Sequence, residues 1–444
     1  MQPGTKCHIC IPRDAQVTKY REKYQWEWGS LPPTIDPHSV VKHDLTRDYL
    51  ARYIQVLLSN PKIDLLTLSI VDGFAGGGEY QSLNNRSFQD GSPLIAIQTV
   101  AEAEARLNIG REKRRRVDTE FFFVEKSPSN FQYLKSLLGA RVDKKFMDSN
   151  VRLYNETFSS AISGIVDRIK SRKHGERALF LLDQYAYDQV PLSLLSRIFG
   201  SLRGSEVLLT FNVDSLVTFL SDREQSRRKL DEIGLASYVD WNALGNLKSE
   251  DVAWKALIQR QLAKGIIEQS GAKYSTIFYI TPAGSSSFTY WLVHLSNVYR
   301  ARDVMMELHW ALANNFSHFL EPDIFVLGHE SKAGSNLRHQ TDLEFGLPFH
   351  FDAVAKERCR NGLTDKLVAR VFENGPQRFM SLLESLGNNT PATTSLIKEA
   401  LDPTIRTKEI EALSIHGARR EKGATVCMSD IIQPAAQRPL FFLH

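Results

Sequence analysis

The sequence of 444 residues lacks long hydrophobic runs. None approaches the roughly 20 apolar residues that a helix needs to cross a bilayer. The first residues, Met1 to Cys7, contain no apolar segment of the secretory kind. Hydrophobic residues make up 42% of the chain and charged residues 24%, which is typical of a soluble protein. We therefore expect a cytoplasmic protein with no membrane partner, and the length predicts two or three domains.

Cysteine is also scarce. Cys7 and Cys10 form a CxxC pair near the N-terminus, whereas Cys359 and Cys427 stand alone. A structural zinc site normally needs a second pair at matching spacing. A site assembled from both ends of the chain stays open as an alternative, but reduced thiols are favoured. No metal site is predicted.

A strong excess of one charge is lacking as well. The net charge of +4 permits a nucleic-acid partner without requiring one. The densest basic run extends from Arg111 to Arg116. This run is either a solvated loop between two elements or a phosphate contact.

The chain does contain apolar runs that alternate with amphipathic segments, which predicts a mostly parallel sheet covered by helices on both faces. The expected strands are residues 65–72, 120–125, 142–147, 178–183, 206–212, 274–281 and 288–296. The last two are expected to pair as a hairpin through the turn at 282–287. A helix is expected at 39–58, and residues 213–273 predict a mostly polar helical insertion.

The composition changes from about residue 356. Helical patterns there are interrupted by the turn-rich segment Asn389 to Thr393, and short strands are expected near 424–428 and 439–443. Helix, turn, helix and ribbon is the plan of a winged helix, which often inserts its second helix into a DNA groove. A small helical packing domain is the alternative.

The most informative segment extends from Ile70 to Tyr80. An apolar strand there ends in Asp72 and leads into a cluster of glycines, Gly76 to Gly78. In open α/β sheets, ligands bind at the carboxyl ends of such strands, where glycines let the backbone approach a nucleoside closely. Taken alone, the cluster is equally consistent with a plain strand-to-turn connection.

Three of the expected strands end in acids, which are Asp72, Glu125 and Asp183. The carboxyl edge of one sheet would bring them to a common crevice. A carboxylate after the second strand can accept hydrogen bonds from both ribose hydroxyls. Each acid alone is consistent with a solvated strand end, but together with the glycine loop they favour a nucleoside site.

NAD and S-adenosylmethionine (SAM) both use this arrangement. NAD needs G-x-G-x-x-G opening a helix directly, so that the pyrophosphate lies at the helix N-terminus. Here the glycines lead into a long polar loop with Asn84, Asn85 and Arg86, before a helix that starts near Gly91. This spacing and the terminal hairpin favour SAM and a class I methyltransferase fold.

The order of several short motifs resembles the three-Cys-motif partner proteins (the TcmP family). These motifs are the glycine loop with Gly91 to Leu94, Glu125-Lys126, Leu182-Asp183, Lys42-His43, and Arg302 to Met305 with Trp310. The likeness extends from about Trp26 to the C-terminus. The family name refers to a partner protein with three cysteines, so the resemblance implies such a partner and does not depend on the cysteines of this chain.

More distantly, Asp72 to Tyr80 with Gly91-Ser92-Pro93 is similar to ribosomal RNA adenine methyltransferases of the RlmJ type. The resemblance implies that SAM contacts a Lys-His pair, the glycine loop, the strand-two acid and an acid after strand three. Carried over, these residues are Lys42, His43, Asp72, Gly73, Phe74, Gly76, Glu125 and Asp148. An exposed helix face is the alternative interpretation of the Lys-His pair.

Amino-methyltransferases of that type carry Asp-Pro-Pro-Tyr after strand four. The acid and backbone carbonyls accept the protons of the target amine, and the aromatic ring stacks on the flipped base. This chain has Asp183-Gln184-Tyr185-Ala186-Tyr187, whereas the TcmP family more often has proline after the acid. The resemblance makes Asp183 the acceptor and Tyr185 or Tyr187 the stacking ring. Methylation at carbon 5 of cytosine is rejected, because it needs a thiolate and no cysteine lies near strand four.

The sequence thus predicts an α/β protein with a Rossmann-like class I methyltransferase seven-stranded sheet, a helical insertion and a C-terminal winged-helix-like domain. The expected boundaries are an N-terminal extension at 1–38, the methyltransferase-like domain at 39–312, a connector at 313–355 and the winged-helix-like domain at 356–444. The predicted function is SAM-dependent methylation of DNA or RNA at an amine of a base. The alternative is a non-catalytic nucleoside- or nucleic-acid-binding partner subunit of a phage-defence or nucleic-acid-modification system.

Overall fold

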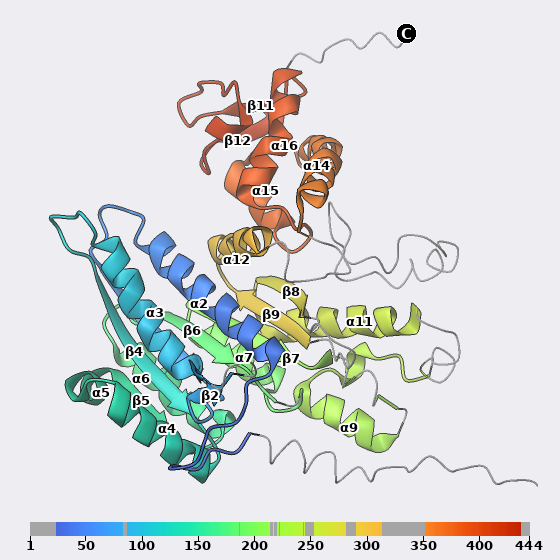
Figure 1. Ribbon diagram of the computed structural model, residues 1–444. Helices are drawn as coiled ribbons and strands as arrows, with labels where there is room; N and C mark the ends of the chain where they lie inside the picture. The colour runs from blue at the N-terminus through green and yellow to red at the C-terminus, as the bar shows by residue number, and fades with distance from the viewer. Residues whose placement is uncertain are drawn as a thin grey trace, which may run out of the picture.

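Seven strands form the central sheet of the computed structural model (Figure 1). The structure describes residues 24–82, 87–185, 187–213, 216, 220–221, 223–242, 244, 253–280, 290–312 and 351–436. The strands are β1 (Leu65–Asp72), β4 (Arg116–Val124), β5 (Val151–Tyr154), β6 (Arg177–Leu182), β7 (Gly204–Phe211), β8 (Tyr274–Ile280) and β9 (Tyr290–Ser296). All residues of β1 except the first are buried, as expected for a parallel strand covered on both faces.

The strand order is β5-β4-β1-β6-β7-β9-β8. The first five strands are parallel, and β9 lies antiparallel between β7 and β8. Numbered along the chain, this order is 3-2-1-4-5-7-6, which is typical of class I methyltransferases. The predicted fold class and the terminal hairpin are confirmed. The expected turn of that hairpin, 282–287, lies outside the described residues.

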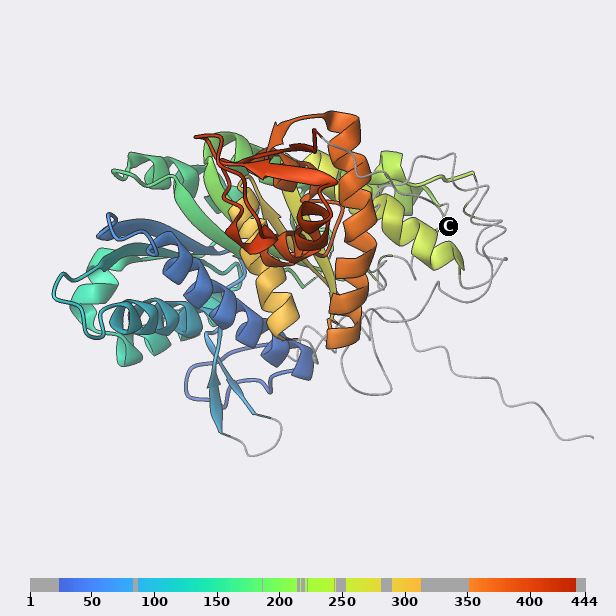
Figure 2. The ribbon, with the colours of Figure 1, turned by 90° about the horizontal axis from the view of Figure 1, so that it is seen from above.

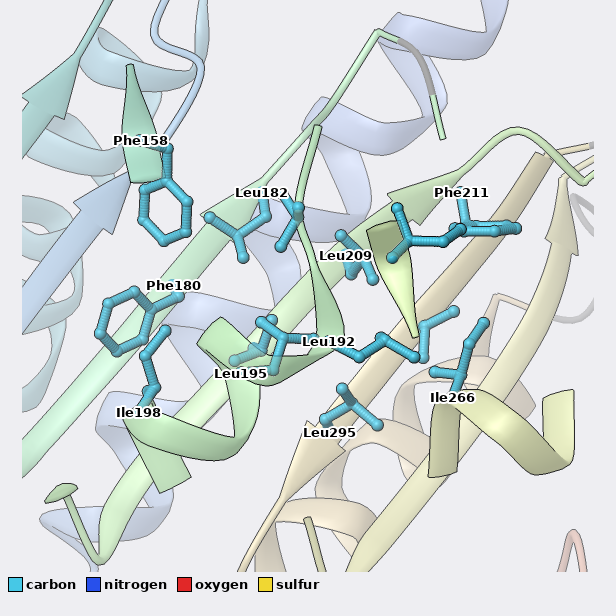
Figure 3. Close-up of a cluster of buried hydrophobic side chains, with 14 of the residues drawn as sticks. Phe158, Phe180, Leu182, Leu192, Leu195, Ile198, Leu209, Phe211, Ile266 and Leu295 are labelled. Carbon is cyan, nitrogen blue, oxygen red and sulfur yellow. The ribbon is translucent and has the colours of Figure 1, made fainter. Parts of the chain in front are cut away.

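Alternating side chains of the strands point into two cores, because successive strand residues face opposite sides of a sheet. On β4, Phe122 and Val124 face one core, and Phe121 and Phe123 face the other. The first core is covered by α6 (Phe158–Ser171), α7 (Leu192–Ser201) and α11 (Ala253–Ser270). Figure 3 shows part of it, with Phe180 and Leu209 from the sheet packed against helix residues such as Leu195.

The second core lies under α2 (Pro37–Leu57), α3 (Ser92–Leu107), α4 (Pro128–Arg141) and α12 (Tyr299–Ala311). The predicted helical insertion is confirmed where it is described, since α9 (Glu224–Ile233) and α11 occupy part of 213–273. No helix of the described ranges is long and apolar enough to cross a membrane.

Two parts of the sheet region differ from the prediction. The polar segment after the glycine loop is a hairpin of β2 (Glu79–Gln81) and β3 (Phe88–Asp90), and not simply a long loop. Its tip with Asn84, Asn85 and Arg86 lies outside the described residues. The strand expected at 142–147 is also wrong. This segment forms α5 (Lys144–Asn150), whose first turn is capped by Asp143 accepting a hydrogen bond from the Phe146 N–H, and the third strand follows as β5.

The C-terminal part contains α14 (Ala353–Asn374), β10 (Gln377–Arg378), α15 (Phe379–Leu386), α16 (Thr394–Arg406), β11 (Ile410–Leu413) and β12 (Ile431–Pro434). The strands pair in the order β10-β12-β11. The predicted order of helix, turn, helix and ribbon is present in α15, the turn before α16, α16 and the β11–β12 ribbon, and α14 and β10 precede it. The strand expected near 424–428 is instead a short 3₁₀ turn, Gly423–Thr425. The one expected at 439–443 lies outside the described residues, as does most of the expected connector.

The winged-helix-like unit lies next to α12 (Figures 1 and 2). Buried polar contacts connect the two. Arg302 on α12 is buried and donates hydrogen bonds to the carbonyls of Ala392, at 2.6 Å, and Thr390. Asp303 is fully buried and accepts from the backbone N–H and hydroxyl of Thr394, at 2.7 and 2.8 Å. Asp303 therefore satisfies an N–H in the first turn of α16 that the helix itself leaves without a partner.

Candidate functional site

The three predicted acids meet at the carboxyl edge of three adjacent strands. Asp72 is the last residue of β1, Glu125 follows β4, and Asp183 follows β6. Strands β4 and β6 flank β1, and Asp72 pairs with Phe123 on one side and Leu181 on the other. The ends of these strands are therefore level, and the acids stand side by side.

Asp72 is almost fully buried, with 1% of its surface exposed. Its Oδ1 accepts a hydrogen bond from the Phe74 N–H at 3.0 Å, whereas its Oδ2 has no partner among the described residues. Burial raises the pKa of Asp72 to about 7, although the Ser92 hydroxyl and the Phe74 N–H oppose this shift. An unsatisfied buried acceptor is costly and calls for an explanation, such as a ligand that supplies the donor.

Glu125 connects the end of β4 to the glycine loop. Its Oε2 accepts from the Gly76 N–H at 3.0 Å, and its Oε1 accepts from the Ser127 N–H at 2.7 Å. Burial raises the pKa of Glu125, and the two N–H donors oppose this shift. The acid is thus held against the loop, with 9% of its surface exposed.

The glycine loop is covered by a side chain from the N-terminal segment. Gly76 has a φ of +60°, and a Cβ atom at Gly77 would lie 2.2 Å from the Trp26 ring. Trp26 is 3% exposed and donates from its indole N–H to the Glu79 carbonyl at 2.7 Å. The space that the glycine at position 77 provides is therefore filled by the protein, whereas the sequence suggested that the glycines serve the approach of a nucleoside.

The predicted residues Gly73 and Phe74 serve the packing of the loop. A Cβ at Gly73 would lie 2.7 Å from a methyl carbon of Leu182, so a side chain does not fit there. The Phe74 ring is half-buried and lies 6.3 Å from the Phe158 ring, measured between centroids. Both residues fix the turn that follows β1.

Lys42 and His43 come to the same edge from α2. The Lys42 Nζ lies 2.6 and 2.7 Å from the two carboxylate oxygens of Asp183, so the pair is bidentate. Burial would raise the pKa of Asp183, but the charge and hydrogen bonds of Lys42 outweigh it and lower the pKa. Burial lowers the pKa of His43 to about 4, and the charge of Asp183 only partly offsets it. At neutral pH Asp183 is therefore a carboxylate and His43 a neutral imidazole.

Of the two tyrosines that could supply a stacking ring, Tyr185 is the exposed one. Its exposed fraction is 53%, two residues beyond Asp183. Tyr187 is half-buried and packs toward the core, with its ring centroid 6.2 Å from that of Phe211. The geometry favours Tyr185 for contact with a target.

Asp148 does not join the site. It is exposed on α5, which precedes the amino end of β5, so it lies at the opposite edge of the sheet. The residue that follows β5 is Asn155, which donates from its side-chain amide to the Glu125 carbonyl at 2.9 Å. The expected acid after the third strand was assigned to the wrong end of that strand.

Two aromatic residues at this edge, Tyr80 and Tyr290, are not among the predicted site residues. Tyr80 is the middle residue of β2, and its ring centroid lies 5.3 Å from that of Trp26 and 5.9 Å from that of His43. Burial raises the pKa of its hydroxyl, and the charges of Asp183, Asp72, Glu125 and Asp36 raise it further. The sequence signal for Tyr80 is its position as the last residue of the glycine motif.

Tyr290 begins β9, which is antiparallel, so its amino end reaches the carboxyl edge of the parallel strands. The Tyr290 ring stacks on His38 with centroids 4.8 Å apart, and the Lys42 Nζ lies 5.9 Å from the ring centre. No sequence motif marks this residue, because its position depends on the pairing of β9 with β7.

The basic run at 111–116 lies at the amino edge of the sheet, away from these acids. Lys113 forms an ion pair with Asp64, Arg115 is buried, and Arg116 begins β4. These contacts give half of the run a structural role. In the described part of the chain, no group of His, Cys, Asp or Glu side chains could hold a metal ion. Cys7 and Cys10 lie outside that part.

No protein-family model matches the sequence, and no curated protein matches it. Among solved structures, protein LPL1258 from Legionella pneumophila is 12% identical, with a TM-score of 0.37 over 63% of this chain and 93% of that one. The bifunctional kinase-methyltransferase WbdD is 12% identical, with a TM-score of 0.31 over 64% and 46%. A SAM-dependent methyltransferase from Agrobacterium tumefaciens is 10% identical, with a TM-score of 0.30 over 60% and 64%. Because these TM-scores are low, the fold assignment rests on the strand order of the sheet.

Proposed function

We propose that the protein is a SAM-dependent methyltransferase that acts on nucleic acid, at an amine of a base. The observation that carries this proposal is the buried Asp72 Oδ2 beside the glycine loop, for which the described residues supply no hydrogen-bond donor. An ammonium group, such as that of the methionine part of SAM, would supply the missing donor and neutralise the carboxylate. The strand order of the sheet supports the same cofactor.

The remaining cofactor contacts would come from residues at the same edge. Glu125 is held in place by two backbone N–H groups and keeps lone pairs for ribose hydroxyls. Lys42 and His43 approach from α2, and the backbone of Gly76 lies next to Glu125. SAM, when bound, supplies an electrophilic methyl group. Asp148 is left out of this set because of its position on α5.

The target side would be formed by Asp183 and Tyr185. Asp183 keeps its charge at neutral pH, since its pKa is lowered, and 43% of its side chain is exposed. It can therefore accept a hydrogen bond from a target amine and hold that nitrogen in place. The exposed Tyr185 ring offers a face on which a base can stack, as aromatic residues do for flipped bases.

One observation favours the second candidate, a non-catalytic partner subunit that binds a nucleoside or nucleic acid. Both oxygens of Asp183 accept from Lys42, so part of the accepting capacity that a target amine would use is already taken. A three-Cys-motif protein would be the partner in this case. The winged-helix-like unit gives little support to DNA binding in either case, because its acidic and basic residues are nearly equal in number, whereas nucleic-acid-binding domains carry a basic face.

Transfer of tritium from labelled SAM to a mixture of DNA and RNA tests the first candidate. We expect label in nucleic acid with the wild-type protein and at least about a hundredfold less with Asp183→Asn, since positioning contributes this much to such steps. Asp167→Asn on the exposed surface of α6 is the matched control and should behave as wild type. If the protein binds SAM but wild type and Asp183→Asn transfer no label, the partner-subunit function is favoured.

A further inference from the structure

The loop after β6 carries a buried glutamine where the resembling sequences more often have proline. Gln184 follows the predicted acceptor Asp183 and is 3% exposed. A polar side chain this buried needs hydrogen-bond partners, or its burial is unfavourable. Its surroundings therefore show what the side chain does in this loop.

The side-chain oxygen of Gln184 accepts two backbone hydrogen bonds from the far end of the same loop. The Gln189 N–H donates at 3.2 Å and the Val190 N–H at 3.1 Å. Within the described residues, neither N–H has another acceptor. Because both partners are donors, the oxygen and not the nitrogen of the amide must face them. The amide thus closes the loop between β6 and α7.

The anchored end of the loop is itself fixed. Val190 is 2% exposed and belongs to the core under α7, and Pro191 is the N-cap residue of that helix. Gln184 therefore connects the start of the loop to the buried Val190 at its end. The side-chain nitrogen of Gln184 is buried and has no partner among the described residues. This unsatisfied donor costs on the order of 1–3 kcal/mol, so the contact is not explained by stability alone.

We propose that Gln184 is a positioning residue, which holds Asp183 and Tyr185 in place. Its side chain restricts the backbone by closing the loop through two hydrogen bonds. The side chain would act through its neighbours, and the inference rests on the proposed function for its catalytic consequence. A displacement of about 1 Å at a reacting group can cost a hundredfold in rate.

The test uses Gln184→Met, which keeps the length of the side chain but removes the acceptor, and Gln184→Glu, which keeps an acceptor and removes the amide donor. Gln98→Met, an exposed glutamine on α3, is the matched control. Three quantities are measured in the full-length protein: amide hydrogen exchange of peptides spanning 183–191, the dissociation constant of SAM, and the kcat of tritium transfer to mixed DNA and RNA.

We expect Gln184→Met to speed exchange in the 183–191 peptides and to lower kcat by about ten- to a hundredfold. Its SAM dissociation constant should stay within about twofold of wild type, because the expected cofactor residues lie on β1 and α2, in the glycine loop and directly after β4, and not in the 183–191 loop. Gln184→Glu should keep the exchange protection and most of the activity, since backbone N–H groups also donate to carboxylates.

The proposal would be overturned if Gln184→Met had the exchange rates and kcat of wild type. It would also be overturned if Gln184→Glu lost as much exchange protection and as much activity as Gln184→Met. Failure of the proposed function can be distinguished from failure of the proposed role of Gln184. A wild-type protein that transfers no label contradicts methylation, whereas the exchange rates in the two variants still decide whether Gln184 holds the loop. If Gln184→Met unfolds, exchange will be faster throughout the protein. In that case the exchange rates of the 183–191 peptides and the kcat of Gln184→Glu test the proposal.

Discussion

The ammonium group of Lys42 on α2 lies 2.6 and 2.7 Å from the two carboxylate oxygens of Asp183, 141 residues away in the sequence. The side chain of Lys42 is 10% exposed and that of Asp183 is 43% exposed. This ion pair joins a residue expected to contact the cofactor with the acid expected to hold the target. A change in either residue should therefore affect the other.

Replacing Lys42 with methionine should raise the pKa of Asp183 and destabilise the protein by about 1 kcal/mol at pH 7, because a partly exposed ion pair contributes little. The pKa of Asp183 is lowered in the folded state, so its contribution is present above the ordinary value of 3.8 and is lost as the pH falls through the lowered value. The difference in Tm between wild type and Lys42→Met should thus shrink as the pH falls below 3.8. Arg47→Met, which breaks an exposed pair with Asp44, should change Tm little at any pH.

Asp72→Asn should stabilise the protein at pH 8 but not at pH 4. The pKa of Asp72 is about 7 in the folded state against an ordinary value of 3.8. The contribution of protonated Asp72 to the free energy of unfolding is therefore fully present below pH 4. It is lost as the pH rises to 7, which lowers the free energy of unfolding by roughly 2–4 kcal/mol. Asparagine keeps an acceptor for the Phe74 N–H and does not ionise, so it avoids this loss.

The measurement is Tm as a function of pH, compared with the exposed control Asp167→Asn. The same Asp72→Asn protein should bind SAM at least about tenfold more weakly, because it lacks the charge that faces an ammonium group. A variant with equal stability to wild type at pH 4 and pH 8 would contradict the raised pKa of Asp72.

Trp26→Ala should destabilise the protein by about 3 kcal/mol, whereas Trp28→Ala should change stability by less than about 0.5 kcal/mol. Trp26 is 3% exposed, fills the space over Gly76 and Gly77, and donates to the Glu79 carbonyl. Trp28 is 58% exposed. Denaturant unfolding of both variants checks the comparison. Equal effects of the two substitutions would show that the glycine loop does not depend on its Trp26 cover.

Asp303→Ala should loosen the winged-helix-like unit from α12, at a cost of roughly 2–4 kcal/mol. The substitution leaves the Thr394 N–H without its acceptor and the exposed Arg300 without one of its two acidic partners. Limited proteolysis should then release a fragment that begins near residue 353. Arg360→Ala, which removes a pair between neighbouring exposed residues of α14, should leave the cleavage rate unchanged. Equal cleavage of wild type and Asp303→Ala would show that Asp303 does not hold this interface.

The sheet could be predicted from sequence where its strands are buried on both faces. The runs at β1, β4, β6 and β7 are rich in buried apolar residues, and their order along the chain implied three acids at one edge. The third strand could not be found in this way, because β5 lies at the edge of the sheet and only its first residue, Val151, is buried. The assignment of Asp148 failed for that reason.

Other features depend on contacts between distant segments, which a periodic pattern does not reveal. Trp26 covers the glycine loop through a contact across about 50 residues, and the pairing of Lys42 with Asp183 needs the packed position of α2. The hydrogen bond from the Gln189 N–H to Gln184 likewise depends on the three-dimensional path of the loop, which the sequence does not reveal. The C-terminal strands β11 and β12 have four residues each, so their apolar signal is too short to locate.

Calorimetric titration of SAM into wild-type protein and into Glu125→Ala tests the central claim most directly. Glu125 joins the strand-two end to the glycine loop, and its loss removes the carboxylate expected to receive the ribose hydroxyls. We predict saturable binding with one SAM per chain in the wild-type protein, and binding at least about tenfold weaker in Glu125→Ala. Wild-type protein that binds no SAM, or binding of equal strength in both proteins, would contradict the account.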